Sequence, residues 1–306
     1  MENTESIKVK ESSSSNKNKS KYVLEFITEK IFMISAFVAV ISLLLIIGFV
    51  FYKGLMPFVT EGYSFIDFIF GTEWLPSSKQ FGIGSMIVTS MVATIGALII
   101  GVPIGILSAI FIAEICPKKY AKIISTAVEL LAGIPSVLYG IFGLAVIVPA
   151  IQTVLNLPKG QSLLAVIIVL AIMMLPTIIS LSETSIRAVP KSYKEGSLAL
   201  GASKIETIFK VTVPAAKSGI LAGVILGIGR ALGETMAVIL VAGNSTAMPT
   251  SLLDSARPLT TNIALEMGYA AGTHQNMLFA TGVVLFIFII IINLVLTKLT
   301  SKGVDR

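Results

Sequence analysis

Six long apolar stretches, separated by polar segments, dominate the pattern along the chain. Each is as long as the roughly 20 residues that an α-helix needs to cross a bilayer. Runs such as Val283–Leu296 lack the alternation of apolar and polar positions that a membrane-spanning strand requires. Because backbone polar groups in lipid must pair within their own segment, the pattern predicts six transmembrane α-helices. Their approximate bounds are 31–52, 83–115, 123–151, 163–186, 220–242 and 277–299.

Glycine and proline interrupt several of these predicted spans. Gly101 and Pro103 fall in the second, Gly133 and Pro135 in the third, and Pro176 in the fourth. Such residues are tolerated in a span where neighbouring helices surround them. We therefore expect spans two to five to form the packed interior, and spans one and six to face lipid.

The chain begins with a polar segment. Residues 1–21 hold five lysines and the run Ser12–Ser15, and they contain almost nothing that could build a core. We therefore expect residues 1–29 to form a disordered tail and residues 30–306 to form one six-span domain. The first apolar run is longer than the modest apolar stretch of a signal peptide, so we expect an uncleaved transmembrane helix.

The composition fits a membrane protein and limits the chemistry available to it. Hydrophobic residues make up 55% of the 306 residues and charged residues 13%, whereas about a quarter of a soluble domain is charged. The single cysteine, Cys116, excludes a disulfide framework and a cysteine-based zinc site. The single histidine, His274, is expected to be a solvated loop residue and leaves little for acid–base catalysis. We therefore predict no metal site and no catalytic residues.

Lysine and arginine are distributed unequally between the two sides that six spans would create. The side with both termini and with the second–third and fourth–fifth connections carries 18 of the 23 basic residues. The opposite side carries four, and Arg230 lies within the fifth apolar stretch. Because basic residues are retained on the cytoplasmic side, we expect both termini in the cytoplasm. The net charge of +6 reflects this spread and not the single basic face of a nucleic-acid-binding protein.

The cytoplasmic segment 187–218 has a pattern of its own. Gly201 interrupts a series of apolar residues among polar neighbours, so we expect two short helices joined at this glycine. Ser203 and Glu206 have the spacing of a capping box for the second helix, and Pro214 is expected to end it. The apolar ridge would either dock into a groove of a partner protein or pack against the chain's own bundle. Its residues are Leu198, Leu200, Ile205, Ile208 and Phe209.

The segments next to the membrane surfaces hold further signals. The aromatic spacing in the outer loop 53–82 predicts a short helix at the outer interface. The outer loop 244–276 is long for a helix bundle. At the inner end of the fourth stretch, Glu183 and Arg187 are four residues apart, which predicts an interfacial salt bridge.

The segment 187–218 also resembles the EAA loop of ABC importer permeases. Glu195 is followed six positions later by Gly201, and the segment ends in VTVP at 211–214, although Gly196 and Ser197 stand where the family has two alanines. In that family the loop forms a coupling helix that sits in a cleft of an ATPase subunit. The resemblance implies ATPase coupling through Glu195, Gly201, Ile205, Ile208, Val211 and Pro214.

Three further segments resemble PstC-type permeases of phosphate-specific ABC importers. They are FGTEWLPS at Phe70–Ser77, GRALGETMAVILVAGN at Gly229–Asn244 and ARPLTTNIALEMGYA at Ala256–Ala270. The resemblance implies an all-α, six-helix type I (MetI-like) permease of the bacterial plasma membrane. It also implies a heterodimer with a PstA-like permease, a PstB-like ATPase dimer and a PstS-like phosphate-binding protein. Because the chain has no G-x-x-x-x-G-K-[ST] motif, ATP and Mg²⁺ would bind to the partner ATPase, with no enzyme activity or cofactor in this chain.

Two charged residues lie inside the fifth predicted span. Arg230 and Glu234 are four residues apart and would share one helix face. Charges at membrane depth cost roughly 2.5–3.5 kcal/mol and usually mark a substrate path. Because an arginine fork matches phosphate oxygens, we expect Arg230 to line the path and Glu234 to hold it when the path is empty; a purely structural ion pair is the alternative. In the outer loop, Arg257 and Glu266 are candidates for an outer gate or a binding-protein contact.

Other functions remain as alternatives. The same machine could carry sulfate, molybdate or phosphonate, which the EAA-like loop does not distinguish from phosphate. An ion-gradient-driven transporter predicts an internal repeat of spans, and we find none in the sequence. An intramembrane enzyme would need a set such as H-E-x-x-H or paired aspartates within spans, and the sequence has neither.

Overall fold

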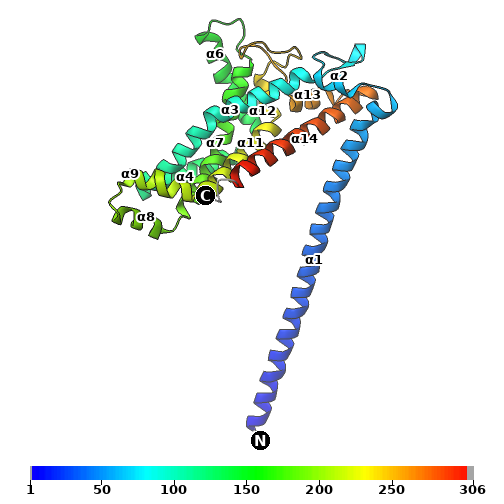
Figure 1. Cartoon of the computed structure of the whole chain (residues 1–306). Helices are drawn as coiled ribbons and strands as arrows, with labels where there is room; N and C mark the ends of the chain where they lie inside the picture. Colours follow the sequence, from blue (N-terminus) through cyan, green and yellow to red (C-terminus); the bar gives the residue numbers. More distant parts are fainter. Residues whose placement is uncertain (1, 302–306) are drawn as a thin grey trace. The chain divides into compact units, whose positions relative to one another are not determined.

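The computed structural model describes the backbone of residues 2–301 and, within them, the side chains of residues 25–295 and of Lys298. The chain divides into two units after Tyr52, and each unit is described by itself. The first unit is the greater part of helix α1 (Glu2–Thr60). The second unit, from Lys53 onward, contains the other helices and a small hairpin (Figure 1).

Helix α1 is longer than the apolar run that predicts it. The structure continues the helix through the polar residues for which the sequence predicts a disordered tail, and no helix end marks residue 29. The reason is local, since neither glycine nor proline occurs before Gly48 to interrupt a helix. The part suited to crossing a membrane is Glu25–Thr60. The division into a tail and a permease domain stays a prediction.

The centre of the second unit is the packing of α3 (Gly84–Ile110) against α7 (Leu163–Arg187). Glycines of α3 allow the two backbones to approach closely. A Cβ at Gly96 would lie 2.7 Å from Ile167 Cδ1, and one at Gly105 would lie 2.7 Å from Ile178 Cγ2. Small residues at a helix interface are the usual way in which membrane helices pack. Helix α11 (Lys217–Gly233) packs on α7 as well, and this makes α7 the most buried of the candidate spans.

The third and fifth spans have other bounds than the sequence predicts. Among the described residues, five helices are long and apolar enough to cross a membrane, or six if a pair of helices bent by 68° counts as one span. The third span begins only at Ser136, because Gly133 and Pro135 separate it from the amphipathic helix α4 (Lys118–Ala132). The single spans are Glu25–Thr60, Gly84–Ile115, Ser136–Val154, Leu163–Arg187 and Thr273–Val295; the bent pair is Lys204–Ala215 with Lys217–Gly233.

The two ends of the second unit are called outer and inner after the orientation that the sequence predicts. The outer end holds a small aromatic core. Strand β1 (Trp74–Leu75) pairs antiparallel with β2 (Gln80–Phe81), so that Trp74 lies opposite Phe81. Both rings are buried against α2 (Phe65–Phe70), which confirms the helix predicted in the first outer loop. Met277 and Leu278 of α14 (Thr273–Ser301) join this core, so the sixth span does not face lipid along its whole length.

The remaining elements connect these helices. Helices α8 and α9 lie at one end of the second unit, and α2, α13 and the start of α14 lie at the other (Figure 1). Wider π-helical turns interrupt or end several helices. The elements are η1 (Pro76–Ser78), η2 (Phe111–Ile115), α5 (Ser136–Phe142), η3 (Gly143–Ile147), α6 (Val148–Val154), α8 (Lys191–Ala199), α9 (Lys204–Thr207), η4 (Ile208–Thr212), α10 (Val213–Ala215), α12 (Met236–Val241) and α13 (Leu259–Glu266).

Candidate functional site

The fifth predicted span is broken at Glu234. Helix α11 ends at Gly233, Glu234 has an extended backbone (φ −69°, ψ 131°), and α12 begins at Met236. The expectation that Arg230 and Glu234 share one helix face is therefore wrong. A glycine followed by two polar residues, Glu234 and Thr235, favours this break, because Gly is a poor helix former and the Glu234 carboxylate can accept a hydrogen bond from a free N–H in the first turn of the next helix.

The two charged residues have different partners. The Arg230 guanidinium is half-buried and donates to Thr177 Oγ1 of α7 at 3.5 Å. The Ala237 N–H donates to Glu234 Oε1 at 3.0 Å, and Thr260 Oγ1 donates to the Glu234 carbonyl oxygen at 2.9 Å. Among the residues that the structure describes, no ion pair joins Arg230 to Glu234. Glu234 thus caps α12 and anchors α13, and it does not neutralise Arg230 in this conformation.

A small cavity lies beside the break. Its volume is about 10 Å³, which is close to the least that one water molecule needs. Helices α3, α7 and α13 surround it together with the two halves of the broken span, and a tetrahedral oxyanion is too large to enter. Its lining residues are Ser90, Ala93, Thr94, Leu170, Ala231, Leu232, Glu234, Val238, Pro258 and Thr260.

The segment 187–218 folds largely as its sequence predicts. Gly201 has φ +88° and joins α8 to α9, and the capping box between Ser203 and Glu206 is formed. The Glu206 N–H donates to Ser203 Oγ at 3.3 Å, and the Ser203 N–H donates to Glu206 Oε2 at 3.1 Å. Pro214 does not end the helix. It lies in the first turn of α10, where a missing N–H is tolerated, and the chain bends at Ala216 instead.

The apolar ridge of this segment is divided between two roles. Leu200 is 91% exposed, and Leu198, Ile205 and Phe209 are about half exposed. Ile208, by contrast, is 2% exposed and packs in an inner apolar core. Ile208 therefore anchors the loop to its own bundle and is not a surface contact, whereas the predicted coupling residues Glu195, Gly201 and Pro214 are exposed and Val211 is half-buried.

Ion pairs tie the inner ends of the helices together. Arg187 Nε donates to Glu183 Oε1 at 2.8 Å, which confirms the predicted salt bridge. Glu183 also accepts a hydrogen bond from Ser125 Oγ of α4 at 2.9 Å. Lys194 of α8 forms an ion pair with Glu114 of η2. This last pair joins positions 80 residues apart, so no local sequence signal marks it.

A buried cluster of polar side chains holds the outer end together. Glu266, of which 6% is exposed, accepts hydrogen bonds from Arg257 Nη1 at 2.7 Å and from Trp74 Nε1 at 2.7 Å. His274 Nε2 lies 2.8 Å from Glu266 Oε2. His274 is therefore not the solvated residue that the sequence predicts. Arg257 also donates to the Asn244 carbonyl oxygen at 2.9 Å and to Asn262 Oδ1 at 3.1 Å.

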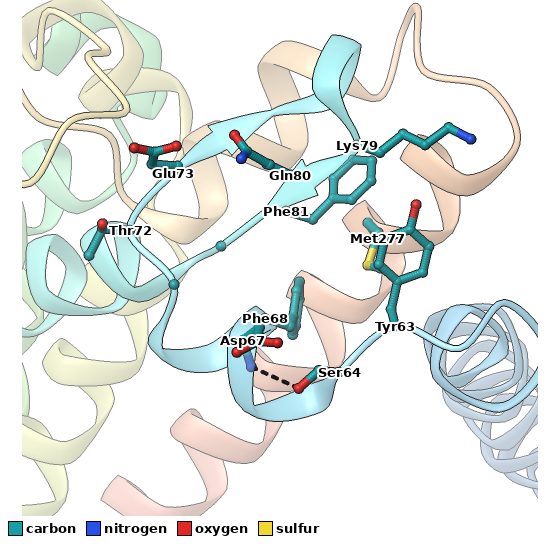
Figure 2. A pocket seen from close by; sticks show the side chains of 12 residues that line it. Tyr63, Ser64, Asp67, Phe68, Thr72, Glu73, Lys79, Gln80, Phe81 and Met277 are labelled. Atoms are coloured by element: carbon teal, nitrogen blue, oxygen red, sulfur yellow. Dashed lines mark hydrogen bonds between the residues drawn. The ribbon is translucent and has the colours of Figure 1, made fainter.

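Two cavities open on the loops of the outer end. The first, of about 360 Å³, is lined by residues that include Phe68, Phe81 and Met277, and Asp67 lies beside Phe68 (Figure 2). The second, of about 440 Å³, lies between the loops 157–159 and 245–255. At its edge, the backbone N–H groups of Thr250 and Ser251 each donate to Asp254 Oδ2 at 2.8 Å and hold the pKa of this carboxyl below its usual range.

In the part of the chain that the structure describes, no group of three or more His, Cys, Asp or Glu residues could hold a metal ion. Cys116 is a free thiol of intermediate exposure.

Comparison with known proteins identifies the family. Residues 101–304 match the family described as "Binding-protein-dependent transport system inner membrane component". The chain is 42% identical over 254 residues to the probable ABC transporter permease protein YqgH of Bacillus subtilis (strain 168), with 82% of each chain covered. It is 36% identical over 290 residues to the phosphate transport system permease protein PstC of Mesorhizobium japonicum (strain LMG 29417 / CECT 9101 / MAFF 303099), covering 87% of this chain and 88% of that protein.

Solved structures agree on the fold. The MetNI methionine ABC transporter has a chain that matches with a TM-score of 0.52 at 20% identity, covering 72% of this chain and 94% of that one. A bacterial ABC transporter involved in the import of the acidic polysaccharide alginate matches with a TM-score of 0.56 at 16% identity, covering 86% and 95%. The fold is that of the type I, MetI-like permeases. The chain belongs to the family of inner membrane components of binding-protein-dependent transport systems.

Proposed function

We propose that the chain is the transmembrane permease subunit of an ATP-driven importer that moves inorganic phosphate into the cytoplasm. The observation that carries this proposal is the 36% identity to a PstC permease along 87% of the chain. The family assignment supports the transport role, and the broken fifth span with a half-buried arginine beside it supports an anionic substrate.

Arg230 is the candidate phosphate contact. Among the described residues, Arg230 makes one long side-chain hydrogen bond, to Thr177, so most of its guanidinium donors stay available to a ligand. The planar fork of these donors matches the oxygens of a phosphate, which loses part of its hydration in the path. Glu234 has a different role from the one that its spacing suggests. It accepts a hydrogen bond from the first turn of α12 and so caps that helix. The break at Glu234 separates α11 from α12, and the two helices can therefore move separately beside the path.

The coupling loop is the candidate ATPase contact. The segment 187–218 is basic and exposes apolar side chains at one end of the bundle. These side chains are Leu200, Ile205 and Phe209. A PstB-like ATPase dimer would receive this ridge and bind ATP and Mg²⁺ itself. A PstA-like permease would supply the second half of the transport path. The excess of basic residues supports an orientation with both termini and this loop in the cytoplasm.

The outer end is the candidate contact for a PstS-like binding protein. The hairpin, α13 and the loop 244–258 gather there, and the two larger cavities open among them. Arg257 and Glu266 pair with each other, so they would act by holding this surface in shape.

Uptake of labelled phosphate tests the substrate. Cells that lack the gene are compared with cells in which it is restored, at low micromolar phosphate and with excess sulfate, molybdate or phosphonate. Restored uptake that is insensitive to these competitors supports the proposal. No restoration, or uptake that sulfate, molybdate or phosphonate abolishes, contradicts the phosphate assignment and favours an importer of another oxyanion.

The same cells test the candidate path residue. Arg230→Gln removes the charge and keeps a polar side chain, and we expect it to reduce uptake while the protein still reaches the membrane. Lys122→Gln, at an exposed position of α4, is the matched control and should transport as the unaltered protein does. Equal uptake by both variants would show that Arg230 is not a phosphate contact.

A further inference from the structure

Lys194, in the middle of the coupling helix α8, forms an ion pair with Glu114 at the inner end of the second span. The pair is partly sheltered from solvent, with 25% of the Lys194 side chain and 11% of the Glu114 side chain exposed. Another ion pair of this loop, Lys210 with Glu206, has 73% and 49% of its side chains exposed and stays within one helical turn. The Lys194–Glu114 pair is therefore the more sheltered of the two, and it connects separate elements.

Glu114 lies in η2, a wide π-helical turn in which one backbone carbonyl oxygen lacks a backbone donor. In η2 the Cys116 N–H donates to the Phe111 carbonyl oxygen at 2.8 Å, which is the spacing of a π-helix. The Ile112 carbonyl oxygen would need the N–H of residue 117, which is Pro117 and has none. Arg187 Nη2 donates to this oxygen instead, at 3.0 Å. Such wide turns occur often at functional sites.

Arg187 extends the connection to the other inner helix ends. It pairs with Glu183 on its own helix α7, and Glu183 accepts from Ser125 of α4. The inner ends of α3, α4 and α7 are thus joined by charge-assisted hydrogen bonds, which are stronger than neutral ones. Helix α8 follows α7 in the chain, and the Lys194–Glu114 pair joins it back to α3. The buried Ile208 holds the far side of the loop against the same inner core.

The second span leads from this connection to the break in the fifth span. Glu114 lies at its inner end, and Ser90 and Thr94, on the same continuous helix, line the small cavity beside Glu234. Ser90 Oγ also accepts a hydrogen bond from the Leu259 N–H at the start of α13, at 3.0 Å. A displacement of the inner end of α3 would therefore move Ser90 and Thr94, which lie beside Glu234 where the path is closed.

We infer that Lys194 and Glu114 are positioning residues that make the coupling loop and the second span move as one body, so that motion of the ATPase reaches the closed point of the path. This inference rests on the proposed function. It requires that loss of the pair lowers the number of phosphate ions moved for each ATP hydrolysed. A pair that only stabilised the fold would lower transport and hydrolysis in the same proportion.

The test uses the whole complex, with its partner permease, ATPase and binding protein, in proteoliposomes. Phosphate uptake and ATP hydrolysis are measured on the same vesicles for Glu114→Gln, Lys194→Gln and the double charge reversal Glu114→Lys with Lys194→Glu. The control is Lys210→Gln, which removes an ion pair of the same loop that does not reach α3.

We expect each single change to lower the transport-to-hydrolysis ratio by about fivefold or more, the lower end of ordinary coupling between sites. The double reversal should recover most of this ratio, and Lys210→Gln should keep all of it. An unchanged ratio in both single variants would overturn the inference. So would a double reversal as uncoupled as the single variants.

A second measurement covers variants that fail to assemble. Glu114→Cys with Lys194→Cys, in a Cys116→Ser background, gives a complex without the ion pair, and a short thiol-reactive bifunctional reagent then joins the two new thiols. We expect a lowered transport-to-hydrolysis ratio before crosslinking and its recovery toward that of the unaltered complex after crosslinking. A ratio that crosslinking leaves low overturns the inference.

The proposed substrate is judged separately. An unaltered complex whose ATP hydrolysis responds to the loaded binding protein but which moves no phosphate would contradict the substrate. In that case the response of hydrolysis to the binding protein, compared among the same variants, still tests Lys194 and Glu114.

Discussion

The buried cluster around Glu266 allows a sharp prediction for Glu266→Gln. The carboxylate is surrounded by Arg257 Nη1, Trp74 Nε1 and the ring of His274. A glutamine keeps the size of the side chain, removes the charge and turns an NH₂ group toward donors. The change therefore removes the anionic partner of the Arg257 guanidinium and leaves a buried N–H without an acceptor.

The magnitude follows from the surroundings of each group. Removing one partner of a buried ion pair costs about 3–5 kcal/mol, and an unsatisfied buried donor costs about 1–3 kcal/mol. Arg257 keeps its bonds to Asn244 and Asn262, and 16% of its side chain is exposed, so the lower end applies. We expect Glu266→Gln to reduce the free energy of unfolding by about 3 kcal/mol, roughly a hundredfold in the unfolding equilibrium.

The chain provides its own reporter for this experiment. Trp74 is its only tryptophan, it is 3% exposed, and its ring nitrogen donates to Glu266. Equilibrium unfolding of the purified protein in mixed micelles, followed by tryptophan fluorescence, therefore measures the cluster directly. Glu73→Gln, an exposed acidic residue next to Trp74, is the matched control and should leave both the midpoint and the emission unchanged. A Glu266→Gln protein with the same midpoint and emission as this control would refute the reasoning.

Three further changes probe other parts of the structure. Gly82→Ala should destabilise the outer hairpin, because a Cβ there would lie 2.4 Å from the backbone carbon of Gly71; thermal unfolding measures this. Ser203→Ala should cost about 0.5–2 kcal/mol of stability in the coupling loop through loss of its capping box, seen as faster amide hydrogen exchange in α9. Leu200→Asp should prevent co-purification of the ATPase, because this side chain is 91% exposed on the coupling loop and would place a charge in an apolar groove.

Each of these changes has a control in the same chain. Gly268→Ala places a methyl group in open space, so a loss of stability equal to that of Gly82→Ala would contradict the packing argument. Ser192→Ala removes an exposed serine of α8, and equal exchange in both serine variants would contradict the capping argument. Ile208→Ala should destabilise the protein without releasing the ATPase specifically, since Ile208 is buried. ATPase retained by Leu200→Asp would contradict the docking role of the ridge.

The sequence predicts the spans well because the bilayer imposes a long apolar run on each of them. It does not predict the break at Glu234. Hydropathy averages over many residues, so a run from 220 to 242 conceals two residues that are not helical, Glu234 and Thr235. The local signal that favours a break is Gly233, followed by the polar residues Glu234 and Thr235. Because the helix ends at Gly233, the four-residue spacing of Arg230 and Glu234 does not place them on one helix face.

The clusters at the two ends were beyond sequence reasoning for a different reason. Trp74 and Glu266 are 192 residues apart in the chain, and Lys194 and Glu114 are 80 apart. Local periodicity places such residues on loops and helix ends but carries no information about which of them meet. His274 illustrates the error, since a polar loop residue is expected in solvent and instead lies against Glu266.

The substrate and the driving partner are tested together by reconstitution. The chain is inserted into proteoliposomes with a PstA-like permease and a PstB-like ATPase, and labelled phosphate is supplied on the PstS-like binding protein. The proposal predicts phosphate accumulation that requires both ATP and the binding protein, and that falls when Arg230 is replaced by glutamine. ATP hydrolysis that responds to the loaded binding protein without any phosphate accumulation would contradict it.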